Sequence, residues 1–265
     1  MAGMNEQERK ALEDFVAREI GAAAAFVKHE EAEFIEHNSW KNVTGHCLIE
    51  AARACVFGDL LGFDHELKKD FALAALLHDG HKKQEIEAIQ EEMRRGGSGR
   101  AASMSATDVY LKELSAKSVP QRVIQFIGFA GGMPEALFAA KDILDQGTAT
   151  SEGLAALLIH YIDAYTRNDE WTEQAAENQN DLDRRAEKNK KNQNYTKIND
   201  EITDILRSHP FFSGRNGFEA MVVIGREIEK KLSPLISMRL GVPIEPVKIP
   251  ETIDGLLRTQ TTVLA

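Results

Sequence analysis

Residues 71–80, FALAALLHDG, are the stretch that decides the fold class of this chain. An unbroken apolar run ends abruptly in His78, Asp79 and Gly80, which is typical of a buried helix with polar groups at its end. Burying an imidazole or a carboxylate without a partner costs several kcal/mol. The usual partner of a buried His/Asp pair is a metal ion, so this stretch predicts a metal site inside a helical core.

Two other segments place single polar residues in similar apolar surroundings. His46 lies within VTGHCLIEAA at 43–52, and Asp163 lies within LLIHYIDAY at 157–165. Both segments have the composition of buried helices, so His46, His78, Asp79 and Asp163 come from three expected helices. Helix bundles commonly build metal sites in this way, from side chains on facing helices.

The rest of the chain also favours helices, because no stretch alternates apolar and polar residues over a convincing length. We therefore predict an all-α fold, with a helical metal-binding domain over 1–170 and a C-terminal helical extension over 171–265. Asp64 is expected to cap the helix that follows it, and Thr150 or Ser151 the helix of Asp163. The first helix is expected over 6–35, glycines form a loop at 96–99, and three prolines predict an extended segment over 241–250.

Composition narrows the classes of partner. The formal net charge of −10 disfavours binding of long nucleic acid, whereas a metal ion can still attract a small anion. No apolar run approaches the roughly 20 residues that span a bilayer, and the start MAGMNEQERK has no signal-peptide character. We therefore expect a cytoplasmic protein that does not bind membranes, and a homodimer stays an open alternative.

The two cysteines are also consistent with a cytoplasmic protein. Cys47 and Cys55 are eight residues apart in an expected helix, which separates them by about 12 Å. That distance is too long for a disulfide bond, so both thiols are expected to be reduced.

The order of the four candidate ligands resembles the HD phosphohydrolase superfamily. That family has a histidine, then a His-Asp doublet, then a distant aspartate, which here are His46, His78–Asp79 and Asp163, with spacings of 32 and 84 residues. The resemblance covers about residues 35–170. It implies an HD-type helical bundle that holds one divalent metal ion, and the donor types leave Mn, Fe, Co, Ni, Zn and Mg all open.

The same resemblance implies the chemistry. A water on the metal ion becomes acidic enough to attack a phosphate ester, and the ion neutralises charge on the phosphate. Between His81 and His160 the sequence has no histidine, which favours a mononuclear site over a two-metal site. The expected substrate is a small phosphorylated molecule, foremost a nucleotide. The alternatives are a catalytically silent nucleotide-binding or regulatory module and a metal oxygenase of the same fold.

Several residues are candidates to assist the metal ion in catalysis or in substrate binding. Lys82, four residues after His78, is expected to clamp the phosphate, and Glu50, four residues after His46, to orient that histidine or act as a base. Asp79 is expected to take part in catalysis as well as in metal binding. For each of them a plain structural or surface role is the alternative. Weaker candidates for substrate binding are His81, Arg53, Arg167 and His37.

Overall fold

The computed structural model describes residues 6–21, 32–33, 39–40, 43–147, 150–166 and 193–262. These residues are almost entirely helical, which confirms the predicted all-α fold; β1 (Ala32–Glu33) and β2 (Ser39–Trp40) form only a short antiparallel pair. The helices are α1 (Glu6–Ile20), α2 (Val43–Leu61), α3 (His65–Leu77), α4 (Lys82–Arg94), α5 (Arg100–Ala116), α6 (Gln121–Ile127), α7 (Pro134–Gln146), α8 (Ser151–Tyr165), α10 (Gln193–Leu206), α11 (Gly217–Leu240) and α12 (Ile249–Thr262).

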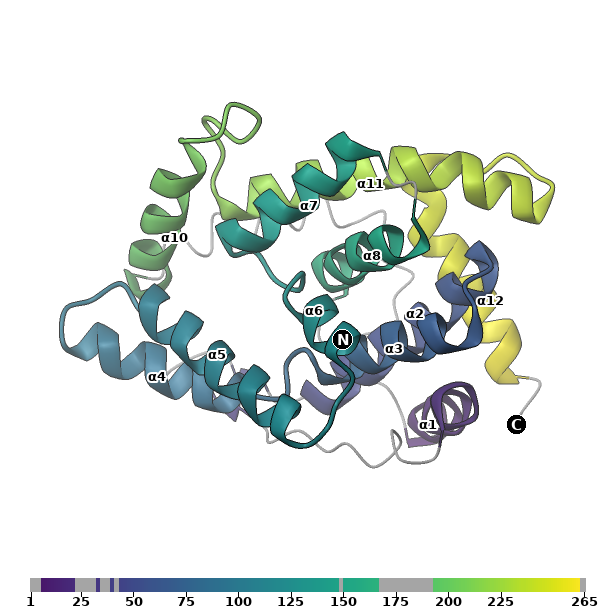
Figure 1. The fold of residues 1–265 in the computed structure, drawn as a ribbon, viewed down its shortest axis with the longest axis horizontal. Coiled ribbons are helices and arrows are strands. Elements are labelled where there is room, and N and C mark those ends of the chain that lie inside the picture. Colours follow the sequence, from purple (N-terminus) through teal and green to yellow (C-terminus); the bar gives the residue numbers. More distant parts are fainter. Residues whose placement is uncertain are drawn as a thin grey trace.

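Helices α2, α3 and α8 form the centre of the bundle. Helix α2 is apolar around nearly its whole circumference, so it must be surrounded, and it packs against α1, α3, α8, α11 and α12. Helix α8 lies in the middle of the view, with α7 and α11 on one side and α2 and α3 on the other (Figure 1). The polar residues of these three helices are therefore held inside a rigid, closely packed core.

The predicted caps position two of these helices. Asp64 accepts a hydrogen bond from the Leu67 amide at 2.8 Å and so starts α3 at His65, earlier than the apolar run alone indicates. Thr150 accepts from the Gly153 amide at 3.0 Å and starts α8. Both caps confirm the sequence prediction.

Helices α4 and α5 form a hairpin beside the central helices, on the same side of the molecule as α10 (Figure 1). The loop between them contains the predicted glycine cluster. Gly99 adopts φ +93°, a conformation that favours glycine, and it lies against Ile89 and Ile198. The tip of the hairpin thereby contacts α10.

The last two helices belong to the same hydrophobic core as the first ones. Buried residues of α11 and α12, among them Ile228, Leu232 and Ile253, form one cluster with Leu12 of α1 and Ile49 of α2. The predicted boundary at residue 170 lies outside the described residues, so the division into a domain and an extension stays a prediction.

Two predicted boundaries were wrong. The first helix ends at Ile20, because Gly21 follows with φ +99°, whereas the sequence suggested a helix as far as residue 35. The proline segment 241–250 is not extended throughout: Pro246 begins a short 3-10 helix, η2 (Pro246–Lys248), and Pro250 lies in the first turn of α12. A first turn tolerates proline because its amide needs no partner within the helix.

Among the described residues, none of the helices combines the length and the apolar character that crossing a membrane requires. Cys47 and Cys55 are both buried, and neither forms a disulfide bond, as predicted.

Candidate metal centre

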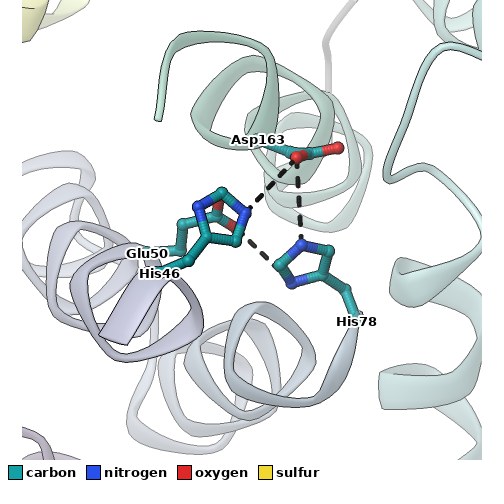
Figure 2. Close-up of side chains that lie close together, drawn as sticks. All are labelled: His46, Glu50, His78 and Asp163. Atoms are coloured by element: carbon teal, nitrogen blue, oxygen red, sulfur yellow. Dashed lines mark ion pairs between the residues drawn. The ribbon is translucent and has the colours of Figure 1, made fainter. Parts of the chain in front are cut away.

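Four buried or nearly buried side chains from three helices point toward one another (Figure 2). His46 lies in the first turns of α2, and Glu50 follows one turn later on the same face. His78 comes directly after α3, and Asp163 projects from α8. His46, Glu50 and His78 are less than 5% exposed, so the packing of the central helices fixes their positions.

Four of the distances among the predicted ligands are short enough for two donors on one ion. Asp163 Oδ1 lies 3.8 Å from Nε2 of His46 and 3.8 Å from Nε2 of His78. Asp79 Oδ2 lies 3.9 Å and 3.6 Å from the same two nitrogens. Two ligands that each bind one ion at about 2.1 Å can be at most about 4.2 Å apart. All four distances satisfy this limit.

Glu50 is closer to these histidines than the sequence alone indicated. Its Oε1 lies 3.0 Å from His46 Nε2, and its Oε2 lies 3.4 Å from His78 Nδ1. One donor atom from each of His46, Glu50, His78 and Asp163 falls within 4.8 Å of the others, so this cluster could hold a metal ion. Asp79 stands beside it.

The backbone sets the orientation of His78. Its Nδ1 lies 2.8 Å from the Ala75 carbonyl oxygen, and because a carbonyl can only accept, Nδ1 is the donor. In the neutral ring, Nε2 then carries the lone pair and faces Asp79 and Asp163, as a metal ligand requires. Cys47 Sγ lies 3.9 Å from Nδ1, on the side of the ring away from those carboxylates.

The electrostatics of the cluster favour a bound cation. Burial raises the pKa of Glu50 well above its ordinary value, and the charges of Asp163 and Asp79 add to this effect. Burial alone would lower the pKa of His78, but Glu50 and Asp79 outweigh it and raise that pKa well above its ordinary value. A field that favours an imidazolium also favours a metal ion at the same place.

Two buried atoms of the cluster fit the same conclusion. Within the described residues, His78 Nε2 and Glu50 Oε1 make no hydrogen bond. A buried polar atom that makes no hydrogen bond costs about 1–3 kcal/mol. A cation bound among these donors would remove that cost, so the residues present fit a metal ion.

Lys82 and His81 lie at the edge of the centre, on the side of the α4–α5 hairpin. Lys82 Nζ is 3.3 Å from Asp79 Oδ1 and 3.1 Å from Glu85 Oε2. Burial would lower the pKa of Lys82, but these two carboxylates raise it well above its ordinary value, so the ammonium stays charged. Its side chain is 22% exposed.

His81 has a different environment from the one predicted for a substrate contact. Its ring stacks on Tyr110 with centroids 4.6 Å apart, and its Nε2 lies 2.9 Å from Thr107 Oγ1. Both partners belong to α5. Burial lowers the pKa of His81, which keeps the ring neutral, and the contacts indicate that it anchors the hairpin.

Of the remaining predicted substrate contacts, the structure describes only Arg53. Arg53 is buried, and all three of its guanidinium nitrogens donate to Asp254 or Thr166. Arg167 and His37 lie outside the described residues.

One contact of the site was not predicted. The Gly131 amide, in the loop between α6 and α7, donates a hydrogen bond to Asp163 Oδ2. This bond holds one carboxylate oxygen and leaves Oδ1 facing the two histidines. The GFAGGM break at 128–133 was visible in the sequence, but nothing in it indicated which side chain the loop would meet.

Comparisons of the chain with models of known protein families, with curated proteins and with solved structures gave no match.

Proposed function

We propose that this protein binds one divalent metal ion through His46, His78, Asp79 and Asp163 and hydrolyses a phosphate ester of a small molecule, foremost a nucleotide. The observation that carries the proposal is the approach of two histidine Nε2 atoms and two carboxylates within 3.6–3.9 Å. The resemblance of the His, His-Asp, Asp order to HD phosphohydrolases supplies the type of reaction.

When bound, a divalent ion acidifies a water and neutralises charge on a phosphate oxygen. The chain's own residues supply the rest. The Lys82 ammonium, held beside Asp79 on a side chain that is 22% exposed, gives a phosphate oxygen a positive partner at the edge of the centre. Glu50, whose pKa burial raises, has a carboxylate oxygen 3.0 Å from His46 Nε2 and is placed to exchange a proton there.

The overall charge of the protein supports a small substrate. A net charge of −10 repels phosphates at long range, whereas the centre itself concentrates a metal ion and Lys82. A compact phosphorylated molecule needs to meet only this local region. A long nucleic acid would also meet the acidic surface.

The test is a phosphate-release screen of nucleotides and sugar phosphates, with Mn²⁺, Co²⁺, Ni²⁺ or Mg²⁺ added to metal-stripped protein. We expect turnover of at least one class, and its loss in Asp163→Asn. Metal content is measured in parallel by elemental analysis. If the protein binds one ion but releases phosphate from no substrate, the hydrolase proposal is wrong and a binding module remains. If the protein binds no ion at all, the proposed metal site is wrong.

A further inference from the structure

A buried ion pair joins the helix of His46 to the last helix of the described chain. Arg53 on α2 donates from Nε to Asp254 Oδ1 at 2.8 Å and from Nη2 to Asp254 Oδ2 at 2.9 Å. The two side chains are 10% and 9% exposed. A two-bond arginine–carboxylate pair fixes direction as well as distance, so Asp254 holds the guanidinium in one orientation.

The third nitrogen of the same guanidinium reaches the helix of Asp163. Arg53 Nη1 donates to Thr166 Oγ1 at 2.8 Å. Thr166 follows α8 directly and closes its last turn, because its amide and its hydroxyl both donate to the Ile162 carbonyl. Asp163 lies in that turn. Arg53 is therefore bonded to the end of the helix that presents Asp163.

One side chain thus connects two of the helices that supply the proposed ligands. Arg53 lies two turns after His46 on α2, and His46 Nε2 is 3.8 Å from Asp163 Oδ1. Metal–ligand distances tolerate only about 0.2 Å, so a small slide of α2 against α8 would spoil the donor set. The spacing between His46 and Asp163 therefore has to be fixed, and the hydrogen bonds of Arg53 to Asp254 and Thr166 fix it.

We propose that Asp254 is a positioning residue of the metal centre: by holding Arg53 against Thr166, it fixes the spacing between His46 and Asp163. The inference rests on the proposed metal site. It makes α12, about 200 residues from the first ligand in sequence, part of the support of the centre.

The experiment is a calorimetric titration of the full-length, metal-stripped protein with Mn²⁺. In Asp254→Asn we expect the dissociation constant to rise about tenfold or more, the usual cost of losing a residue that orients a ligand. The absorption spectrum of the Co²⁺-loaded variant should also differ from that of the wild type, because the donor geometry changes.

The matched control is Asp70→Asn. Asp70 is 10% exposed and accepts from Arg122 Nε and Nη2 at 2.7 and 2.6 Å, and this pair joins α3 to α6, which carries none of the proposed ligands. We expect a comparable loss of melting temperature with little change in Mn²⁺ affinity. If Asp254→Asn does not fold, Thr166→Val keeps the Arg53–Asp254 pair, removes the bond from Arg53 to Thr166 together with the hydroxyl's bond to Ile162, and should still weaken Mn²⁺ binding several-fold.

The outcomes separate the two proposals. If the wild type binds Mn²⁺ and the folded Asp254→Asn and Thr166→Val variants bind it equally well, the positioning role is overturned and the metal site stands. If the wild type binds no metal ion, the proposed function fails and the positioning role fails with it.

Discussion

At the scale of single residues, the centre holds more carboxylates than one ion needs from its protein. Asp79 faces the Nε2 atoms of both histidines, whereas Glu50 faces Nε2 of His46 but Nδ1 of His78. Since His78 Nδ1 is the donor to Ala75, an ion bound through Nε2 of His78, as proposed, would lie on the side that Asp79 faces, whereas Glu50 faces Nε2 only at His46. The two carboxylates therefore have different expected roles.

Asp79→Asn should weaken metal binding about tenfold or more, because the amide removes a charged ligand. Glu50→Gln should weaken it less and should raise the melting temperature of the metal-free protein, since it replaces a buried acid whose pKa burial raises. Titration calorimetry and thermal melts with and without metal check both expectations. A larger loss of affinity in Glu50→Gln than in Asp79→Asn would make Glu50 the ligand instead.

Gly131→Ala tests the contact that orients Asp163. Gly131 has φ +85° and open space around an added Cβ, so alanine costs about 1–2 kcal/mol of backbone strain and disturbs the amide that holds Asp163. Gly214→Ala is the matched control, with φ +82° and equally open space, in the segment between α10 and α11. Both variants should melt earlier, and only Gly131→Ala should bind metal more weakly. Equal metal affinities in the two variants would show that Gly131 does not support the metal site.

At the scale of elements, α2 and α3 approach closely at Gly58. An added Cβ there would lie 2.6 Å from Lys68 Cγ, and Lys68 bridges Glu19 and Asp59. We expect Gly58→Ala to destabilise the protein by about 1–2 kcal/mol, because crowding outweighs the better helix propensity of alanine. Gly255→Ala in α12 has open space and should stabilise by about 0.5–1 kcal/mol. Chemical denaturation measures both, and a stabilised Gly58→Ala would contradict the close approach.

The ion pair between Glu19 of α1 and Lys68 of α3 predicts a pH dependence. Burial would raise the pKa of Glu19, but hydrogen bonds from Lys68 and Arg18 outweigh it and lower that pKa below its ordinary 4.5. A lowered pKa in the folded state contributes stability above pH 4.5 that is lost as the pH falls through the folded value.

Glu19→Gln imitates the protonated acid, so it should be less stable than the wild type at pH 7 and nearly equal to it at about pH 3. Urea unfolding across this range is the measurement. A difference that persists unchanged at about pH 3 would show that the charge of Glu19 contributes nothing.

At the scale of the whole molecule, the centre ties α2, α3 and α8 together at the core, so a bound ion should stabilise the entire fold. An ion that binds only the folded state adds about 2.7 kcal/mol at a free concentration of 100 times its dissociation constant. Melting temperature should therefore rise with Mn²⁺ and fall again with a chelator. Asp163→Asn is the control, whose melting temperature should respond little to Mn²⁺. A wild-type melting temperature independent of Mn²⁺ would contradict a site in the core.

Much of the architecture followed from local rules that the sequence itself carries. The apolar run of 71–77, the cap at Asp64 and the cap at Thr150 indicated buried helices, because burial and capping act over a few residues. The four candidate ligands were chosen for the same reason: polar side chains in apolar helices need partners. Boundaries set by a positive φ at Gly21 or by a tolerated proline at Pro250 were missed, because several local conformations remain open there.

Contacts between distant segments were decided only by the tertiary structure. The sequence placed Arg53 near a phosphate, but folding brings Asp254 to it from α12 and leaves its guanidinium in a buried pair. It likewise brings the Gly131 amide to Asp163 and both Glu50 oxygens to the two histidines. Helix periodicity determines which residues must be buried, whereas the partner that each buried charge meets depends on how the helices pack.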